Sequence, residues 1–323
     1  MNGFGRIFRI NIFGESHGTL VGVCIDGCRH GIELCESDFL QDIQRRKSGK
    51  RGTSLRIEQD MPEIVSGIFN GFTTGAPITI LFGNKNVQPE DYFQYKTHPR
   101  PSHADFAAMK KFDGFNDYRG SGHFSGRLAL PLVAAGVVAK KHLPDININA
   151  KLVEVGGEKD INAAIEQAMN DGDSVGGIVE CIAKNIPVGL GEPFFDSVES
   201  QIAHLAFAIP AVKGIEFGAG FSSAKMRGSK HNDIINDERG TTATNHSGGI
   251  TGGISNGNDL TFRIAVKPTS SIAKNQKTFD FEHKKISELK ISGRHDTCIA
   301  LRIPVIAEAI TAIALADFIL LKK

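Results

Sequence analysis

The 323-residue sequence has no tryptophan, no long apolar run free of charge and almost no net charge. Its most apolar stretch, residues 303–321, is interrupted by Pro304, Glu308 and Asp317. A charge at the centre of a bilayer costs about 2.5 to 3.5 kcal/mol, so we expect a core helix here and not a membrane span. Residues 1–12 lack the apolar stretch of a signal peptide, which favours a cytoplasmic location.

Cysteine is also scarce. The five cysteines are an odd number, which argues against a disulfide framework. Cys24, Cys28, His30 and Cys35 are close enough in sequence to raise the question of zinc, but cysteines paired two residues apart are missing, so no metal site is expected.

The net charge of +1 gives no overall field that would attract nucleic acid.

Two nucleotide-binding motifs are absent, the Gly-x4-Gly-Lys-Ser/Thr P-loop and a Gly-x-Gly-x-x-Gly fingerprint after a strand. One local basic cluster is present, with Arg45, Arg46, Lys47, Lys50 and Arg51. Such a cluster is most often a solvated face, and the functional alternative is an anion site. A non-enzymatic RNA-binding protein is a further alternative, but no aromatic residues are interleaved with the cluster.

Alternating apolar residues predict half-buried strands at residues 8–13, 21–25, 64–69, 78–82, 178–183 and 260–266. Many Gly-rich turns between strands are too short for a helix, which favours antiparallel pairing. Helices are predicted over residues 38–47, 103–112, 126–142 and 197–208, with Ser37, Ser102, Ser125 and Asp196 as start signals. Segments 128–139 and 305–320 are apolar nearly all round, so both must be covered on several sides. We expect one α+β domain over residues 1–323.

Three distant segments each place a histidine among small or charged neighbours, at residues 14–18, 100–105 and 293–296. Histidine moves protons near neutral pH, and arginine binds carboxylates and phosphates. Ser102 and Asp105 match a capping box, which would put His103 in a first helical turn where anions are favoured. The Gly-rich residues 246–257 and the Lys267 segment after them offer amides, hydroxyls and an ammonium group to a phosphate-bearing cofactor. This combination predicts proton chemistry on a highly anionic ligand.

Taken in order, these segments resemble the chorismate synthase family. The matching residues span nearly the whole chain: 14–18, 45–46, 100–105, 117–120, 125–127, 189–193, 211–214, 246–257, 267–271, 293–296 and 304–308. The resemblance implies a lyase that converts 5-enolpyruvylshikimate 3-phosphate to chorismate by anti 1,4-elimination of phosphate and a ring proton. It implies reduced FMN, required but not consumed, with reducing equivalents from NADPH through a separate flavin reductase. It further implies a sandwich of antiparallel sheets around apolar helices and assembly as a homotetramer, with no nucleic-acid or membrane partner.

The resemblance also assigns roles to residues. His103 would protonate or stabilise the departing phosphate, His17 would protonate or polarise the flavin, and Asp296 would help the flavin accept the ring proton. Ser16 and Ser125 would give polar support. The implied substrate-binding residues are Arg46, Arg51, Arg100, Arg127 and Arg294. The implied FMN-contacting residues are His123, Phe124, Ser125, Pro210, Ala211, Gly252, Lys267, Pro268, Thr269, Ser270, Ser271 and Arg294.

Two features qualify this assignment. His123 and Phe124 stand where the family commonly has Arg-Ser, and Pro210 stands where a polar residue is common, so only backbone contact is expected at Pro210. A conventional FMN-dependent oxidoreductase with net hydride transfer is the alternative activity. It would oxidise one flavin per turnover, whereas the elimination would oxidise none.

Overall fold

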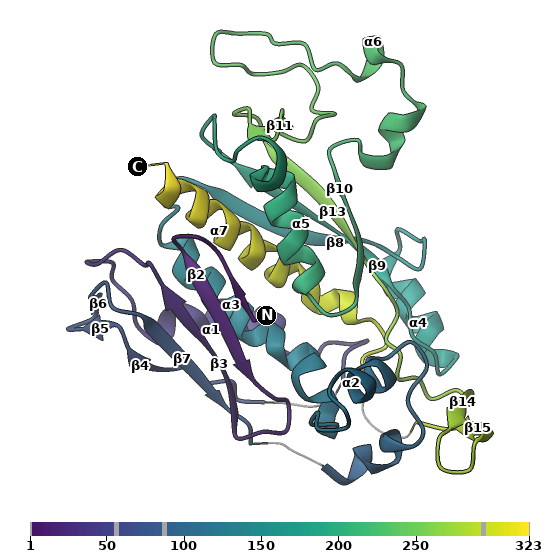
Figure 1. Cartoon of the computed structure of the whole chain (residues 1–323). Helices are drawn as coiled ribbons and strands as arrows, with labels where there is room; N and C mark the ends of the chain where they lie inside the picture. Colours follow the sequence, from purple (N-terminus) through teal and green to yellow (C-terminus); the bar gives the residue numbers. More distant parts are fainter. Residues whose placement is uncertain (1, 55–57, 86–88, 292–294, 323) are drawn as a thin grey trace.

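The structure is a computed structural model that describes residues 2–54, 58–85, 89–291 and 295–322. Two antiparallel sheets form its framework (Figure 1). The first sheet has the strand order β1 (Gly3–Phe4), β2 (Arg9–Gly14), β3 (Leu20–Asp26), β7 (Ile78–Gly83) and β4 (Glu63–Ser66). The second has the order β10 (Val212–Phe217), β13 (Leu260–Val266), β9 (Gly177–Lys184) and β8 (Asn147–Val155).

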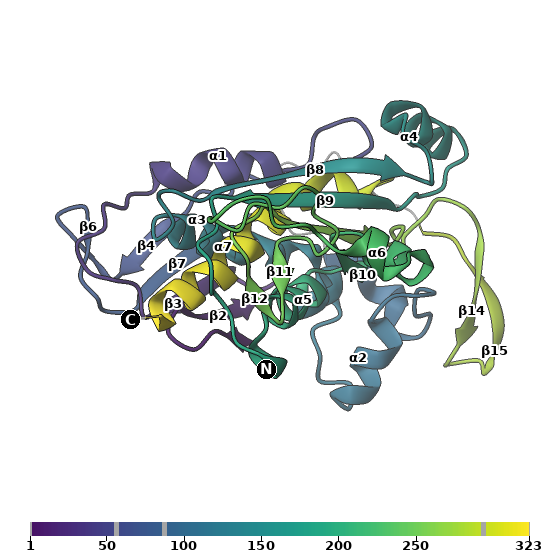
Figure 2. The ribbon, with the colours of Figure 1, turned by 90° about the horizontal axis from the view of Figure 1, so that it is seen from above.

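Two apolar helices, α3 (Ala129–Lys140) and α7 (Ile303–Leu321), pack against each other between the sheets (Figure 2). Helix α3 covers β2 and β3, while α7 covers β8 and β9. Helices α1 (Ser37–Arg46) and α5 (Val198–Ala208) flank this pair. Two helical stretches, Arg119–Lys140 and Ile299–Leu321, are long and apolar enough to cross a membrane, but most of each is buried inside the fold. The prediction of a core helix at residues 303–321 is confirmed.

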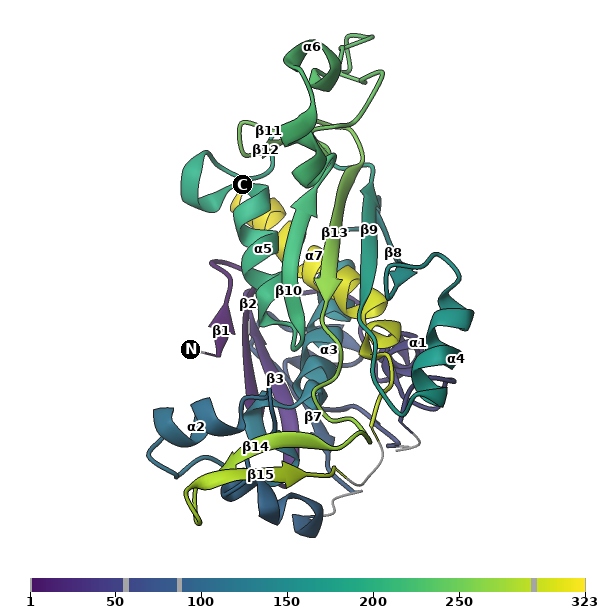
Figure 3. The same ribbon diagram turned by 90° about the vertical axis from the view of Figure 1, so that its right-hand side faces the viewer.

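Smaller elements complete the chain. Three hairpins pair β5 (Ile68–Phe69) with β6 (Phe72–Thr73), β11 (Ile250–Thr251) with β12 (Ile254–Ser255), and β14 (Gln276–Asp280) with β15 (Lys285–Leu289). The short helices are α2 (Asp105–Lys111), α4 (Ile161–Asn170) and α6 (Gly228–His231). The 3-10 helices are Pro89–Lys96, Arg119–Phe124, Gly126–Leu128, Phe194–Asp196, Gly220–Lys225 and Ile299–Arg302. Figure 3 shows α2 and the β14–β15 hairpin at one end of the molecule and α6 with β11–β12 at the other.

The predicted α+β sandwich is confirmed, because every strand pair in both large sheets is antiparallel and the two apolar helices lie between them. The strand predicted over residues 64–69 is broken at Gly67, whose φ of 84° no strand residue adopts, so β4 and β5 belong to different sheets. Of the strands in the two large sheets, β1, β8 and β10 were not predicted, although β8 alternates apolar and polar residues.

Three predicted helix starts are wrong. Ser37 is the first residue of α1, and no side chain caps that helix. Ser197, and not Asp196, caps α5, because its hydroxyl accepts a hydrogen bond from the Ser200 amide at 3.0 Å. Helix α2 begins only at Asp105, and Ser102, with φ of 56°, caps nothing. His103 therefore precedes the helix and does not lie in its first turn.

The crossing of α3 and α7 depends on Gly136. A Cβ atom there would lie 2.6 Å from the Cα of Ala309, well inside van der Waals contact. Replacing glycine by alanine inside a helix stabilises the helix by about 1 kcal/mol. Overpacking a core costs about 1 to 3 kcal/mol or more, so the collision outweighs this gain. We expect Gly136→Ala to lower the free energy of unfolding by about 1 to 2 kcal/mol, measured by urea denaturation. Gly228→Ala, whose Cβ would meet nothing within 4 Å, is the control and should change little.

Candidate active site

A cavity of about 660 Å³ opens between strands β1 and β2, the segment that precedes α2, the end of α5 and the segment after β13. This volume is in the range that holds small-molecule ligands. Apolar side chains form one part of its wall, including Ile12, Leu128 and Leu132. Polar and charged residues form the rest, among them Arg100, His103, Ser121, Lys213 and Lys267. The cavity therefore suits a ligand with both a flat apolar part and anionic groups.

Arg100 and His103 meet on the cavity wall around one carboxylate. The Arg100 guanidinium donates to Asp105 Oδ2 and Oδ1, each at 2.8 Å, and its side chain lies over the Tyr95 ring. His103 Nδ1 lies 2.6 Å from Asp105 Oδ1. Burial alone would raise the pKa of Asp105, but hydrogen bonds from Arg100 and His103 outweigh it and hold that pKa well below its usual range. Asp105 is thus a fixed anion that orients both side chains.

His17 lies on the other side of the segment that carries Ser121. Its ring is buried and meets the Tyr92 ring edge to face, with 5.0 Å between the ring centroids. The Ser16 amide donates to the Gly122 carbonyl at 3.1 Å. A side chain at Gly120 would overlap both Nδ1 of His17 and the hydroxyl of Ser16. Residues 120–122 therefore link the two predicted catalytic histidines, although Ser16 and His17 do not line the large cavity.

Asn84, at the end of β7, connects the His17 loop to a cluster of arginines. Its side-chain amide donates to the carbonyls of Glu15 and Gly18, at 2.9 and 2.8 Å. Its side-chain oxygen accepts a hydrogen bond from Arg127 Nε. Both hydrogens of the amide nitrogen are thus donated, and the oxygen accepts from the guanidinium. The same side chain thus fixes the loop and the orientation of a guanidinium.

The arginine cluster is built around the buried carboxylate of Asp60. Arg127 donates to Oδ1 at 2.8 Å and Arg46 to Oδ2 at 3.1 Å. Burial, together with the charges of Arg302 and Arg127, lowers the pKa of Arg46 to about 10 against the opposing effect of Asp60. The Nε atom of Arg46 is buried and makes no hydrogen bond to the residues that the structure describes. A bound anion would satisfy this donor and relieve the crowding of positive charge.

Asp296 belongs to the same cluster. Its Oδ1 accepts from the Ser54 amide at 2.7 Å, and its Oδ2 accepts from Arg302 at 3.2 Å. Arg302 also donates to the Arg46 carbonyl at 3.0 Å. Within this part of the described chain, three guanidiniums face two carboxylates, which leaves one positive charge for a ligand.

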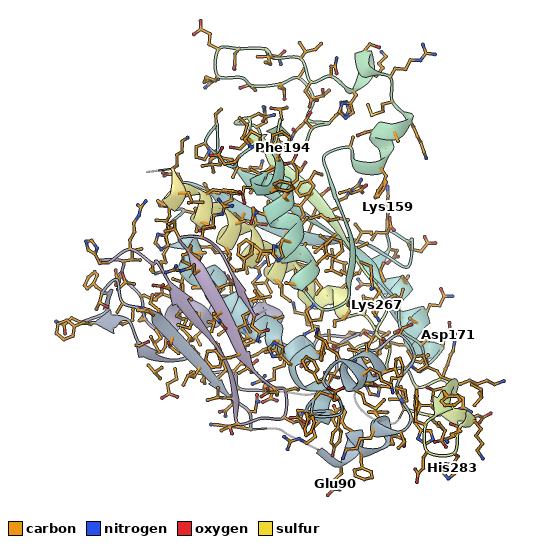
Figure 4. All side chains as sticks on the ribbon, viewed as in Figure 1. Glu90, Lys159, Asp171, Phe194, Lys267 and His283 are labelled. Carbon is orange, nitrogen blue, oxygen red and sulfur yellow. The ribbon has the colours of Figure 1, made fainter. Side chains whose placement is uncertain are left out.

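Besides Arg100 and His103, the cavity wall has a second charged region around Lys267. Figure 4 shows Lys267 at the opposite end of α5 from Phe194. The Lys267 ammonium donates to Ser270 Oγ at 2.8 Å and to the Ser102 carbonyl at 3.2 Å. Burial lowers the pKa of Lys267, and the charge of Lys213 lowers it further. Two lysines that repel each other beside serine hydroxyls form a site that a phosphate group would stabilise.

Most of the predicted site residues lie at this cavity. Those that line it are Arg100, His103, His123, Phe124, Ser125, Pro210, Ala211, Lys267, Pro268, Thr269, Ser270 and Ser271. Arg46, Arg127 and Asp296 do not line it, because they belong to the cluster around Asp60 and Arg302. Gly252 does not line it either, because the turn between β11 and β12 lies at the opposite end of the molecule (Figure 3). Arg51 is not part of the Asp60 cluster: its side chain is 70% exposed and bonds to Glu166. Arg294 lies outside the described residues.

The sequence-based prediction missed four residues that organise the site, namely Asp60, Asn84, Ser121 and Arg302. A polar residue directly after a strand was a usable signal for Asn84. Asp60 gave none, since nothing in the sequence distinguishes it from the neighbouring acidic residues Glu58 and Glu63, and its left-handed φ of 48° is visible only in the structure. Of the cysteines considered as zinc ligands, Cys28 lies in the core with its Sγ 3.3 Å from His142 Nε2. No group of three metal-binding side chains occurs in the described part of the chain.

The family model of chorismate synthase matches residues 8–320. The chain belongs to the chorismate synthase family. The chorismate synthase of Chitinophaga pinensis is 60% identical over 324 aligned residues, which cover 100% of this chain and 98% of that protein. Chorismate synthases of Dehalococcoides mccartyi and Korarchaeum cryptofilum are 46% and 44% identical, with 99% and 98% of this chain covered and 96% and 97% of theirs. A crystal structure of a chorismate synthase superposes with a TM-score of 0.76 at 26% identity, covering 99% of this chain and 93% of that one.

Membership in the chorismate synthase family makes this protein a lyase of aromatic amino acid biosynthesis. The prediction of family and enzyme class from sequence motifs is confirmed. The roles of individual residues are a separate matter, which the geometry of the site addresses.

Proposed function

We propose that this enzyme binds 5-enolpyruvylshikimate 3-phosphate and reduced FMN together and eliminates phosphate and a ring proton to form chorismate. The observation that carries the proposal is the convergence of His103, Arg100 and the Lys267 segment on one 660 Å³ cavity, with His17 linked to it through residues 120–122. The substrate has two carboxylates and a phosphate, so such a site must combine positive charge with proton donors.

The residues present fit the flavin. The repulsion between Lys213 and Lys267 favours a phosphate, and the apolar part of the wall offers a surface for the ring system. We propose that Lys267, Ser270 and Ser271 hold the cofactor phosphate end and that Phe124, Ser125 and Ala211 border its ring. When bound, reduced FMN supplies electron density as the phosphate leaves. Reducing equivalents would come from NADPH through a separate flavin reductase.

The protein's own contribution is charge and proton placement. Near an effective dielectric of 20, a charge pair 4 Å apart is worth about 4 kcal/mol, so the Arg46 cluster can offset repulsion among the substrate's anionic groups. Asp105 accepts from His103 Nδ1 and leaves Nε2 beside the Ser121 hydroxyl on the cavity wall, so His103 is the proposed source of the proton for the departing phosphate. Asp296, held by Ser54 and Arg302, is the proposed partner for the ring proton.

The test is anaerobic turnover of the substrate with dithionite-reduced FMN. Phosphate release and the flavin spectrum are followed together. Many molecules of phosphate released per flavin, with the flavin still reduced, would support the elimination. One flavin oxidised per phosphate would instead identify the net hydride-transfer alternative.

Arg46→Ala should weaken substrate binding strongly, because it removes a buried charge and leaves Asp60 with only Arg127. Truncating one partner of a buried charged pair costs about 2 kcal/mol or more, so we expect KM to rise at least about 30-fold. Arg239→Ala is the control, since that side chain is 87% exposed and bonds only within its own loop in the described structure. Unchanged affinity in Arg46→Ala would return the basic segment to a solvated or structural role.

We also propose that the protein assembles as a homotetramer. Three large apolar side chains, Phe194, Phe195 and Phe221, are each more than 80% exposed, and Figure 4 shows Phe194 at the end of the molecule opposite α2. Exposed apolar clusters of this kind mark interaction surfaces. The mass in solution by light scattering tests the assembly, and a monomer at micromolar concentration would contradict it.

A further inference from the structure

Ser121 holds an unfavourable backbone conformation on the cavity wall. Its φ is 70°, and its neighbours Gly120 and Gly122 have φ of 56° and 52°, so three consecutive residues lie in the left-handed region. Glycine reaches this region without strain, but serine does not. A glycine would fit the backbone better here, so the side chain is retained against a conformational cost. Strained residues at a cavity wall often carry a function.

The Ser121 hydroxyl lies between two groups of the proposed proton donor. Arg100 Nη2 donates to its oxygen at 3.0 Å, and its oxygen lies 3.2 Å from His103 Nε2. On the other side of the imidazole, Asp105 Oδ1 is 2.6 Å from Nδ1. Arg100 Nη2 also lies 3.1 Å from Nδ1, but the contact with Asp105 is the shorter one. Because a carboxylate only accepts hydrogen bonds, we assign a hydrogen to Nδ1 in both protonation states of His103. The proton that comes and goes is therefore the one on Nε2, which faces Ser121.

The direction of the Ser121 hydroxyl then depends on the charge of His103. When the imidazole is neutral, Nε2 is an acceptor and the hydroxyl donates to it. When the imidazole is protonated, Nε2 donates to the serine oxygen, and Arg100 occupies the second lone pair. The hydroxyl hydrogen must then turn elsewhere. Ser121 lines the 660 Å³ cavity, so an anion bound there is its natural acceptor.

We propose that Ser121 relays the proton from His103 to the departing phosphate, an inference that rests on the proposed function. In this step the serine O–H bond breaks as an O–H bond forms on a phosphate oxygen. The Nε2–H bond breaks as the serine O–H bond is restored. One proton passes from the imidazolium to phosphate, His103 ends neutral with its Nδ1–H on Asp105, and no electrons are transferred. Two cationic donors on the serine oxygen make its proton easier to give up.

Ser121→Gly is the decisive variant, because it removes the hydroxyl and also relaxes the backbone. We expect kcat at saturating substrate and reduced FMN to fall about 10- to 100-fold, below the range for loss of a complete general acid, since a water can partly replace the hydroxyl. KM should change by less than about 3-fold and the melting temperature should stay equal or rise. Asp113→Gly is the matched control: Asp113 has φ of 50° and is exposed, so the same relaxation there should leave kcat unchanged.

A double-mutant cycle with His103→Ala separates a relay from an independent role. If Ser121 acts only through His103, the double variant will be no slower than His103→Ala alone. If instead the fold-losses in kcat of the two single variants multiply in the double variant, the relay is wrong. An unchanged kcat in Ser121→Gly, or a rise in its KM alone, would also overturn the relay. None of these outcomes affects the proposed function. Failure of the unmodified enzyme to turn over with reduced FMN would instead overturn the proposed function itself.

Discussion

Turnover by His103→Ala should be about 10² to 10⁴-fold below that of the unmodified enzyme, the usual effect of removing a positioned proton donor. His103 lines the cavity, and its ring is held by Asp105 on one side and by Ser121 on the other. Without a proton donor, phosphate is a poorer leaving group. The fall in activity should therefore appear in kcat more than in KM. The measurement is anaerobic steady-state phosphate release at saturating substrate.

The control for this variant is His231→Ala. His231 ends helix α6, at the opposite end of the molecule from α2, and bonds to Ser223. Its loss should leave turnover and the circular dichroism spectrum unchanged. A His103→Ala variant that folds normally and keeps full turnover would remove His103 from the mechanism.

Gly120→Ala should reduce turnover about as much as His17→Ala, by roughly 10² to 10⁴-fold, through displacement of the His17 ring. A methyl group at Gly120 would overlap Nδ1 of His17, and the backbone there has φ of 56°. The site cannot accommodate the methyl group by moving the ring without losing its packing against Tyr92. Turnover under the same anaerobic conditions, compared between the two variants, tests this expectation.

Gly114→Ala separates backbone strain from collision. Its φ is 82°, so alanine there is also strained, but a Cβ atom meets nothing within 4 Å. We expect a modest loss of stability and nearly normal turnover. If Gly114→Ala and Gly120→Ala lose activity equally, strain near α2 rather than contact with His17 explains the effect.

The fold could be predicted well because its signals are local. Apolar alternation located β2, β3, β7, β9 and β13 within a residue or two, and the all-apolar segments located α3 and α7. Helix starts were less predictable. A serine near the N-terminus of a helix caps that helix only if the backbone conformation brings its hydroxyl close to the amides of the first turn. At Ser102 the left-handed backbone prevents this.

The site was predictable by residue type but not by arrangement. The sequence indicated that Arg45, Arg46 and Arg51 belong to one basic segment, yet the three have different partners. Successive helical residues point about 100° apart, so Arg45 reaches Glu308 on α7 while Arg46 reaches Asp60. Arg51 follows the helix and bonds to Glu166. Only the positions of α4, α7 and the loop around Asp60 decide which guanidinium is left for a ligand.

By itself, the sequence determined the family, the antiparallel sandwich and the presence of histidines and arginines for an anionic ligand, because these depend on residue order and periodicity. The tertiary structure decided which side chains meet. It linked His17 to His103 through three left-handed residues, and it placed Asn84 and Asp60 where they orient Arg127. Hydrogen bonds and charge pairs form over a few ångströms between residues far apart in the chain, so their partners are fixed only when the sheets and helices have packed.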